Sequence, residues 1–396
     1  MPRTIAVFTG ARAEYGLLKS VIRNIVHKGS CALQTIVSGT HLSSDFGSTI
    51  EEIRNDGIPV HHIVEAQLTG GTQIEVCGAM GEALARYAKV LQSIRPDLLI
   101  LLGDRFETFS MAAAATVCQI PIAHIHGGEA TEGLIDEPFR HAITKMSHIH
   151  FAACEAYRQR IIQLGESPDR VFTVGSLGVE NVKNTELLDA SSIRKELNLP
   201  DCVPYLLCTM HPVTLDRQSA REQISGVCEA LNQFPEFAVV FTGANADPGG
   251  TEINVILRTL TKNSQHRFFM SLGQKRYFSA VKYAACVIGN SSSGIIEVPS
   301  FRTPVIDIGD RQKGRVGADS VIHCEANVDA IVKALAFAFS KEYRKILTTV
   351  DNPYDIPGTA QCIVESVASL PLDGILQKHF YDIPCHERLE STAPQA

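Results

Sequence analysis

Imidazole and carboxylate side chains gather in one short stretch near residue 130 of the chain. His126 is followed by a diglycine and Glu129, and Asp136 comes seven residues after Glu129. His124 lies two residues before His126, on the same face of an expected strand. Asp104 ends an earlier apolar run. Because the carboxyl ends of parallel strands meet at one edge of a sheet, the groups are expected to lie together and to form an acid–base site.

Plainer interpretations of these residues stay open. Asp104 can be the N-cap of the helix that follows it, since a carboxylate accepts from the free N–H groups there. His124, His126 and a carboxylate can also hold Zn²⁺, although the diglycine spacing is not typical of zinc ligands. His211 follows the apolar run 205–209. Its imidazole is expected to face the same cleft and donate to a phosphate, unless its role is structural.

Small and hydroxyl side chains after residue 288 are suited to a phosphate ligand. The run 289–294, Gly-Asn-Ser-Ser-Ser-Gly, follows an apolar strand and begins a short helix. Ser291, Ser292 and the N–H groups of the helix start can therefore donate to a diphosphate. Glu297 follows one turn later and can accept from two ribose hydroxyls. A Ser N-cap with a glycine turn is the alternative, but strand, cap and Glu297 together favour phosphate binding.

Cations in two glycine-bounded loops would add positive charge for such a ligand. Arg12 lies in an expected loop at 10–16, and Arg311 is one of three cations in the segment 309–315. Solvated turns are the alternative in both places. Neither G-x-G-x-x-G after the first strand nor G-x-x-x-x-G-K-[ST] occurs in the chain, which argues against a Rossmann dehydrogenase and a P-loop NTPase.

The elements that must position these residues alternate along the chain. Short apolar runs are separated by longer helical patterns, which predicts parallel sheets covered by helices on both faces. Helices are expected at 17–26, 74–91 and 106–118, among others. Strands are expected at 5–8, 33–37, 60–64, 97–102, 121–125, 148–153 and 171–174, and again at 205–209, 238–242, 267–270, 286–288 and 305–308.

A polar stretch at 175–191 divides the chain into two such series. We therefore expect an α/β protein with two doubly wound, Rossmann-like domains, residues 1–178 and 179–370, and a cleft at the carboxyl ends of their strands. Residues 371–396 form a polar tail that is expected to pack back on the first domain.

Composition sets limits on the class of protein. A length of 396 residues suits two or three domains, and 45% hydrophobic with 20% charged residues is typical of a globular protein. The formal net charge of -7 argues against a nucleic-acid partner. The 11 cysteines are scattered without a C-x-x-C pair, against a disulfide scaffold or a Cys-rich zinc site. With no signal-peptide pattern and no apolar run of about 18 residues, we expect a cytoplasmic protein without a membrane partner.

Taken together, the motifs resemble those of the hydrolysing UDP-N-acetylglucosamine 2-epimerases of bacterial sialic-acid and legionaminic-acid synthesis. The resemblance covers nearly the whole chain, and it implies the GT-B fold of that family, with the active site in the cleft between two Rossmann-like domains. It is carried by residues 9–16, 102–105, 124–129, 136–141, 145–147, 174–178, 211–212, 288–294 with 297, 308–315 and 380–384.

The resemblance also implies roles for individual residues. The first domain would supply Asp104, the loop from His126 to Glu129 and Asp136 as the catalytic group, together with His211 of the second. Many relatives carry glutamate at the place of His126, so the general base stays open among His126, Glu129 and Asp136. UDP would be held mainly by the second domain, with no cofactor or metal, in a homodimer or homotetramer. The residues implied at UDP are Arg12, Arg105, His211, Asn245, Leu272, Ser291, Ser292, Glu297 and Arg311.

The implied reaction converts UDP-N-acetylglucosamine and water into N-acetylmannosamine and UDP, which feeds sialic acid synthesis. The C2 hydrogen of the sugar is not beside a carbonyl, so its removal must accompany departure of UDP, whose developing charge cations stabilise. Water then adds to the resulting glycal, and a proton returns to the opposite face of C2. Three alternatives remain. The first is an epimerase of UDP-N,N'-diacetylbacillosamine with the same motifs, and the second is a GT-B glycosyltransferase that needs an acceptor. The third is a non-catalytic sugar-nucleotide sensor, which could dispense with Asp104, Glu129 and Asp136.

Overall fold

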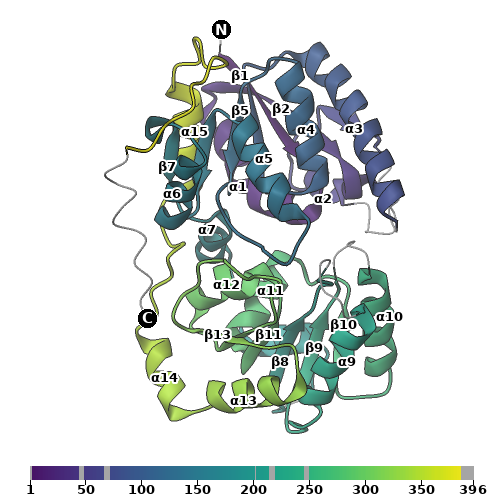
Figure 1. The fold of residues 1–396 in the computed structure, drawn as a ribbon. Coiled ribbons are helices and arrows are strands. Elements are labelled where there is room, and N and C mark those ends of the chain that lie inside the picture. Colours follow the sequence, from purple (N-terminus) through teal and green to yellow (C-terminus); the bar gives the residue numbers. More distant parts are fainter. Residues whose placement is uncertain are drawn as a thin grey trace.

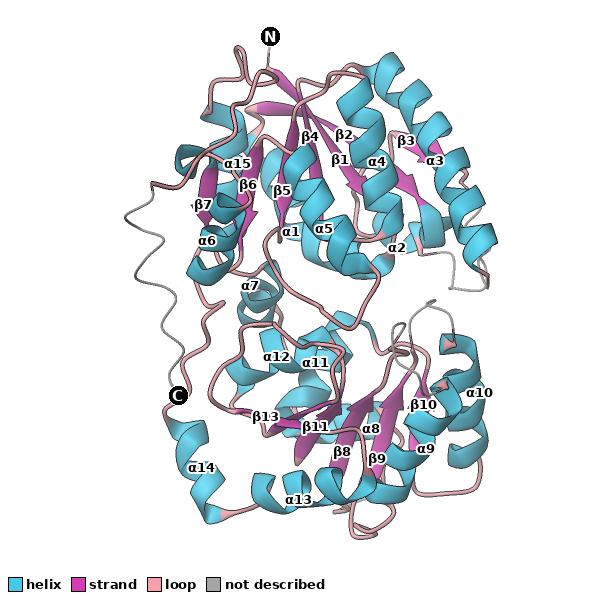
Figure 2. Ribbon diagram, viewed as in Figure 1, coloured by secondary structure: helices cyan, strands magenta, loops and turns pink. Residues whose placement is uncertain are grey.

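Two parallel sheets, each with its own helices, form two lobes (Figures 1 and 2). The structure is a computed structural model that describes residues 2–43, 49–66, 72–200, 202–213, 219–244 and 249–384. We call the first sheet with the helices packed on it the first lobe, and the second sheet with its helices the second lobe. The expected α/β fold of two Rossmann-like, parallel-sheet domains is confirmed.

The first sheet has seven described strands in the order β3-β2-β1-β4-β5-β6-β7, all paired in parallel. The strands are β1 (Arg3–Thr9), β2 (Cys31–Ser38), β3 (His62–Val64), β4 (Leu98–Leu102), β5 (Ile122–Ile125), β6 (Ile149–Ala152) and β7 (Val171–Thr173). The helices of this lobe are α1 (Arg12–Lys28), η1 (Gly39–Leu42), α2 (Ile50–Asn55), α3 (Gln73–Ile94), α4 (Phe106–Val117), α5 (Asp136–Met146), α6 (Glu155–Gln163), η3 (Pro168–Arg170), α7 (Leu177–Asn184) and α15 (Thr359–Ser369).

The second sheet has six described strands in the order β10-β9-β8-β11-β12-β13, again all parallel. The strands are β8 (Tyr205–Thr209), β9 (Ala238–Thr242), β10 (Arg267–Phe269), β11 (Cys286–Gly289), β12 (Val305–Ile308) and β13 (Val321–Cys324). The helices are α8 (Ala190–Glu196), α9 (Ala220–Leu231), α10 (Gly250–Thr261), α11 (Gly273–Tyr283), α12 (Ser292–Ile296), η4 (Val298–Phe301), α13 (Val328–Ala338) and α14 (Lys341–Thr348).

Burial on both faces explains why the central strands are apolar throughout. In β4, Leu98, Ile100 and Leu102 belong to the core that contains α1 and α15, while Leu99 and Leu101 belong to the core of α3 and α4 on the other face. Successive side chains of a strand point to opposite faces, so a strand covered by helices on both sides needs apolar residues at every position.

The expected strands agree closely with the observed ones. β8, β9 and β12 have the expected bounds, and the other expected strands differ from the observed ones by at most two residues at either end. The edge strand β13 was not expected, because only its first residue, Val321, is buried and its sequence lacks a continuous apolar run.

In two places the observed helices differ from what the sequence predicted. The loop expected at 10–16 is shorter, since α1 begins at Arg12. The polar stretch 175–191 contains all of α7 and the start of α8. Both helices are short, α8 is largely exposed, and α7 buries only Leu177, Gly178 and Val179 at its start, so their polar composition does not reveal a helical period.

The last described helix returns to the first lobe. Ile363, Val364 and Val367 of α15 share the core of α1, at the upper left in Figure 1. The division of the chain at residues 178 and 370 remains a prediction, and it assigned α15 to the second domain. Beyond α15, Tyr381 N donates to Gly165 O at 2.9 Å, which brings the following segment against α6.

Candidate active site

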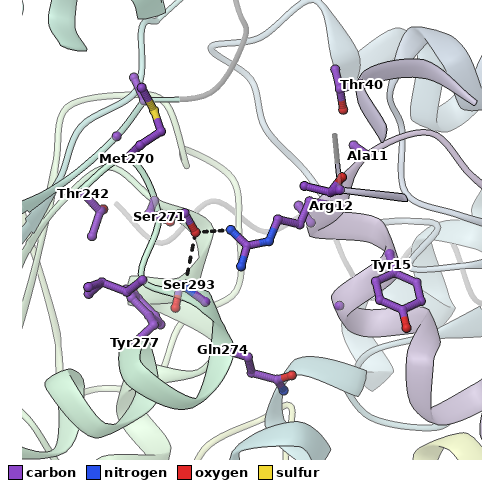
Figure 3. Close-up of a pocket in the computed structure, with 18 of the residues that line it drawn as sticks. Ala11, Arg12, Tyr15, Thr40, Thr242, Met270, Ser271, Gln274, Tyr277 and Ser293 are labelled. Carbon is purple, nitrogen blue, oxygen red and sulfur yellow. Dashed lines mark hydrogen bonds between the residues drawn. The ribbon is translucent and has the colours of Figure 1, made fainter. Parts of the chain in front are cut away.

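A cavity of about 720 Å³ lies between the two lobes. Figure 3 shows Arg12 and Tyr15 on one side of it and Met270, Ser271 and Tyr277 on the other. The volume lies within the range of small-molecule sites in proteins, roughly 300–1,000 Å³. Five of the residues expected at UDP line this cavity: Arg12, Arg105, Leu272, Ser291 and Glu297.

Two arginines of the first lobe point their charge into the cavity region. Arg12 Nε donates to Glu52 Oε2 at 2.9 Å, and Arg12 Nη1 donates to Ser271 Oγ across the cavity (Figure 3). Arg105 Nε donates to Glu107 Oε2 at 3.2 Å, and Glu107 is fully buried. Each guanidinium is thus oriented by a carboxylate of its own lobe.

A buried carboxyl group shapes the turn that leads into α1, whose first residue is Arg12. Gly10 N and Ala11 N donate to Glu14 Oε2 at 2.7 and 3.2 Å, and Thr108 Oγ1 donates to Glu14 Oε1 at 3.2 Å. These bonds satisfy N–H groups at the start of α1, which explains why the helix begins earlier than expected. Burial, and then the negative charge of Glu107, raises the pKa of Glu14 to about 7.

Glu297 follows α12 in the second lobe and touches the first. A Cβ added to Gly178 of α7 would lie 2.0 Å from Glu297 Oε1, so this carboxylate rests directly on the backbone of α7. Burial raises the pKa of Glu297 above its ordinary value. Glu297 Oε2 is buried and makes no hydrogen bond within the described part of the chain. Ser291, the N-cap of α12, and Ser293 lie on the same wall.

His126, Glu129 and Arg315 form a buried polar cluster beside this wall. His126 Nδ1 lies 3.2 Å from Glu129 Oε1, and Arg315 Nη1 lies 2.6 Å from Glu129 Oε2. Burial alone would raise the pKa of Glu129, but the charges of Arg315 and His126 outweigh it and hold this pKa below its ordinary value. His126 and Arg315 also act electrostatically on Glu297, so the cluster adjoins the cavity.

The diglycine after His126 gives this loop its path. His126 has a φ of 65°, in the left-handed region that a non-glycine residue adopts only at a cost. A Cβ on Gly128 would lie 2.4 Å from Tyr157 O, and a Cβ on Gly127 would lie 2.9 Å from a histidine ring nitrogen. Only glycines fit between these neighbours, so the chain can turn from β5 into the cluster.

His124 has a structural role instead. Its Nε2 lies 2.7 Å from Gly103 O, and its Nδ1 lies 3.2 Å from Thr144 Oγ1. Burial lowers the pKa of His124 to about 3, so its ring is neutral. β5 ends at Ile125, and the alternation expected to bring His124 and His126 to one face does not extend to His126.

Asp104 pairs with a buried arginine. Arg140 Nη2 of α5 donates to Asp104 Oδ2 and, at 3.1 Å, to Thr131 Oγ1. The N-cap of α4 is Arg105 rather than Asp104, so the capping role considered for Asp104 is not realised. Asp136, the first residue of α5, is partly exposed.

His211 and Arg311 meet at Asn290. His211 N donates to Asn290 Oδ1 at 2.7 Å, Asn290 Nδ2 donates to His211 O at 2.8 Å, and Arg311 Nη1 donates to Asn290 O at 3.1 Å. Burial, and then the charge of Arg311, lowers the pKa of His211 well below its ordinary value. One asparagine of the serine-rich motif therefore fixes the backbone of His211 and the guanidinium of Arg311.

Most of the expected site residues contact other expected residues or line the cavity, but they form several separate groups. Asp104, His126, Glu129, Asp136, His211, Ser292 and Arg311 are not among the described residues that line the cavity. Ser292 is the first residue of α12, next to the cavity residue Ser291. Asn245 lies outside the described residues.

Sequence reasoning missed three contacts of the site. The contact of Gly178 with Glu297 and the pair of Arg315 with Glu129 join residues more than a hundred positions apart, and no local pattern indicates them. Glu14 had a local signal, since an acidic residue near a helix start can accept from the first N–H groups.

Two absences concern only the described residues. None of them form a group of three or more His, Cys, Asp or Glu residues arranged to hold a metal ion. Likewise, no helix in the described ranges is long and apolar enough to cross a membrane.

Comparison with known proteins assigns the family. A family model described as UDP-N-acetylglucosamine 2-epimerase matches residues 23–368. The chain belongs to the UDP-N-acetylglucosamine 2-epimerase family. The resemblance drawn from its motifs is thereby confirmed.

Curated relatives match this epimerase-family chain over almost its full length. It is 37% identical to the GDP/UDP-N,N'-diacetylbacillosamine 2-epimerase (hydrolyzing) of Campylobacter jejuni, with 96% of this chain and 99% of the relative covered. It is 34% identical to the polysialic acid biosynthesis protein P7 of Escherichia coli, with 96% and 98% covered.

A solved structure of the family has the same fold. The UDP-GlcNAc 2-epimerase from Neisseria meningitidis, bound to UDP-GlcNAc, superimposes with a TM-score of 0.77 at 16% identity. The match covers 92% of this chain and 99% of that one. At this identity the likeness concerns the arrangement of the two lobes.

Proposed function

We propose that the protein is a hydrolysing UDP-N-acetylglucosamine 2-epimerase, which converts UDP-N-acetylglucosamine and water into N-acetylmannosamine and UDP. The observation that carries this proposal is the buried His126–Glu129–Arg315 cluster beside a cavity shared by both lobes. Family membership alone would also suit a protein that only binds a nucleotide sugar. A buried imidazole–carboxylate pair supplies the proton transfer that epimerisation at C2 needs.

In this proposal, cations and helix N–H groups hold UDP across the cavity. Arg12 and Arg105 approach from the first lobe, while Ser291, Ser292 and the start of α12 donate to the diphosphate from the second. Glu297 accepts from the ribose hydroxyls. Arg311 and His211, joined through Asn290, stabilise the charge that develops on the leaving phosphate. Leu272, which lines the cavity, is expected beside the nucleotide, and the same role for Asn245, which lies outside the described residues, stays a prediction.

His126 is suited to removing the C2 proton. Its Nδ1 lies 3.2 Å from Glu129 Oε1, so the negative charge of the carboxylate favours the proton on Nδ1 and leaves the lone pair at Nε2. His126 Nε2 is buried and has no hydrogen-bond partner among the described residues, which leaves it available to a substrate atom. Glu129, held ionised by Arg315, stabilises the imidazolium that forms.

The reaction proceeds in two steps. As His126 takes the C2 proton, the electron pair of that C–H bond forms the C1=C2 double bond, and the C1–oxygen bond breaks with its pair going to UDP. Water then adds its oxygen to C1 of the glycal, and a proton is delivered to the opposite face of C2. Asp104, oriented by Arg140, and Asp136 are the candidates to activate the water and return the proton.

A second substrate is favoured by one specific observation. The relative in Campylobacter jejuni, 37% identical to this chain, is named for UDP-N,N'-diacetylbacillosamine and its GDP counterpart. That sugar carries its acetamido group and proton at C2 in the same way, so the chemistry proposed for His126 applies without change. The two substrates differ at C4 and C6.

The test is proton NMR of the purified protein in D₂O with either UDP-sugar and no acceptor. Free N-acetylmannosamine deuterated at C2, together with UDP, is the expected product from UDP-N-acetylglucosamine. Turnover of the diacetylbacillosamine nucleotide alone would assign the second substrate. Inertness toward both, or a requirement for an acceptor, would contradict the proposal and favour a glycosyltransferase.

Three further expectations belong to this proposal as predictions. The first is the domain division at residues 178 and 370, with a tail from 371 to 396. The second is a homodimeric or homotetrameric state, and the third is a cytoplasmic location. Size-exclusion chromatography with light scattering measures the second of these directly.

A further inference from the structure

The loop that follows β12 in the second lobe contacts a loop of the first lobe. It runs from Asp310 to Val316, and Glu132 N of the first lobe donates to Lys313 O at 3.2 Å. A Cβ on Gly133 would lie 2.8 Å from Asp310 O, and a Cβ on Gly314 would lie 3.0 Å from a side chain of the first lobe. The backbones of the two loops are thus in direct contact.

Arg315 is the residue of this loop that enters the polar cluster. Its Nη1 lies 2.6 Å from Glu129 Oε2, and the two side chains are only 6% and 4% exposed. The second oxygen of Glu129 faces His126. Burial of a carboxylate has a large desolvation cost, which a paired cation offsets. Within the described part of the chain, Arg315 is the arginine that pairs with Glu129.

Two tyrosines fix the backbone next to Arg315. Val316 N donates to Tyr157 Oη at 2.9 Å, and Tyr354 Oη donates to Val316 O at 2.5 Å. The two hydroxyl groups lie 2.7 Å apart. Because both polar groups of Val316 are bonded, the backbone next to Arg315 is held in place beside Glu129.

The same loop carries a residue proposed to contact phosphate. Arg311 lies four positions before Arg315, and its Nη1 donates to Asn290 O. One short loop therefore carries both Arg311, the residue proposed to contact phosphate, and Arg315, the residue that pairs with Glu129.

We propose that Arg315 is a positioning residue, which holds the Glu129 carboxylate ionised and oriented toward His126 and ties its position to the loop that contacts the nucleotide. This inference rests on the proposed function of the same site. Through Arg315, the second lobe thus contributes to a proton transfer that is carried out by residues of the first lobe.

The first measurement of the test does not require activity. With glutamate labelled at Cδ, the ¹³C signal of Glu129, assigned by its loss in Glu129→Gln, is followed against pH in the wild type and in Arg315→Gln. The midpoint is expected to move to higher pH in the variant, since the compensating cation is gone. The titratable groups that face Glu129 and could contribute to this shift are His124, His126, Cys154, Tyr157, Arg315 and Tyr354.

The second measurement is the pH profile of turnover. Arg315→Gln is expected to lower kcat by at least about tenfold, to leave the Kd for UDP within about threefold and to move the acid limb of kcat to higher pH. Arg86→Gln is the matched control, because Arg86 and Glu82 form a 2.6 Å pair on the exposed surface of α3. The control should keep the wild-type profile.

The outcomes separate the two proposals. A wild type that turns over neither UDP-sugar refutes the proposed function, while the Glu129 titration still tests Arg315. An unchanged Glu129 midpoint and an unchanged acid limb in Arg315→Gln would overturn the inference. If that variant does not fold, Tyr354→Phe removes the bond to Val316 O and should move the same midpoint upward by a smaller amount, and an unchanged midpoint there overturns the inference as well.

Discussion

Replacement of Gly178 by Ala is expected to weaken UDP binding through Glu297. Gly178 is the second residue of α7 and is not among the glycines with positive φ, so alanine suits its backbone. In an ordinary helix the change would stabilise by up to about 1 kcal/mol. Here the new Cβ would lie 2.0 Å from Glu297 Oε1 and 2.9 Å from its Cδ, distances that real Cβ atoms essentially never show.

The displacement sets the size of the effect. The Glu297 carboxylate must move by about 1 Å or more to restore a normal contact with the methyl group. A hydrogen bond lengthened by that amount is lost, and hydrogen bonds to charged groups contribute roughly 1.5–3 kcal/mol. If Glu297 accepts from the ribose, the Kd for UDP should rise by roughly 10- to 150-fold.

Isothermal titration calorimetry with UDP measures this directly. Gly226→Ala is the matched control, because Gly226 lies in α9 and an added Cβ there meets nothing within 4 Å. In a Glu297→Ala background, Gly178→Ala should have little further effect on the Kd, since the carboxylate it would displace is gone. A Gly178→Ala protein that binds UDP within about twofold of the wild type would refute the role of Glu297.

Two further changes test the acid groups. Asp104→Asn keeps an acceptor for Arg140 but removes the charge, and kcat in the NMR assay is expected to fall well beyond threefold; a smaller loss, under about 1 kcal/mol of barrier, would remove Asp104 from the catalytic group. The pKa of Glu14 is raised to about 7 in the fold from an ordinary value near 4.5, so the folded state binds its proton more tightly and loses stability as the pH rises through this interval. Glu14→Gln should therefore gain stability relative to the wild type by up to about 3 kcal/mol between pH 5 and 8, and equal urea midpoints for the two proteins at pH 8 would contradict the raised pKa.

The strands were predictable because burial on two faces leaves a local record. β4 is apolar at every position from Leu98 to Leu102, since both of its faces are covered. β13 left no such record, because an edge strand with one buried residue needs no apolar run. The return of α15 to the first lobe was not predictable either, since an amphipathic helix shows that it has a buried face but not against which sheet that face packs.

The candidate site follows the same rule. His126, Glu129 and Asp104 were found because each follows a strand, and strand ends can be located in the sequence. The partners that orient them, Arg315 and Arg140, were not recognised as such. Arg315 pairs with a residue 186 positions away, and such contacts depend on how the lobes pack rather than on any local pattern.

The contacts between the lobes imply that nucleotide binding and assembly of the acid–base group are linked. Glu297 rests on Gly178, Arg12 reaches Ser271, and Arg315 pairs with Glu129, so each side of the site is completed by the opposite lobe. If the lobes separated, Glu129 would lose its pairing with Arg315 and with it the orientation toward His126. A ligand that bridges the lobes stabilises the arrangement by its difference in affinity for the two states. Under the proposed function, UDP would be the leaving group and also a ligand that bridges the lobes and so favours the pairing of Arg315 with Glu129.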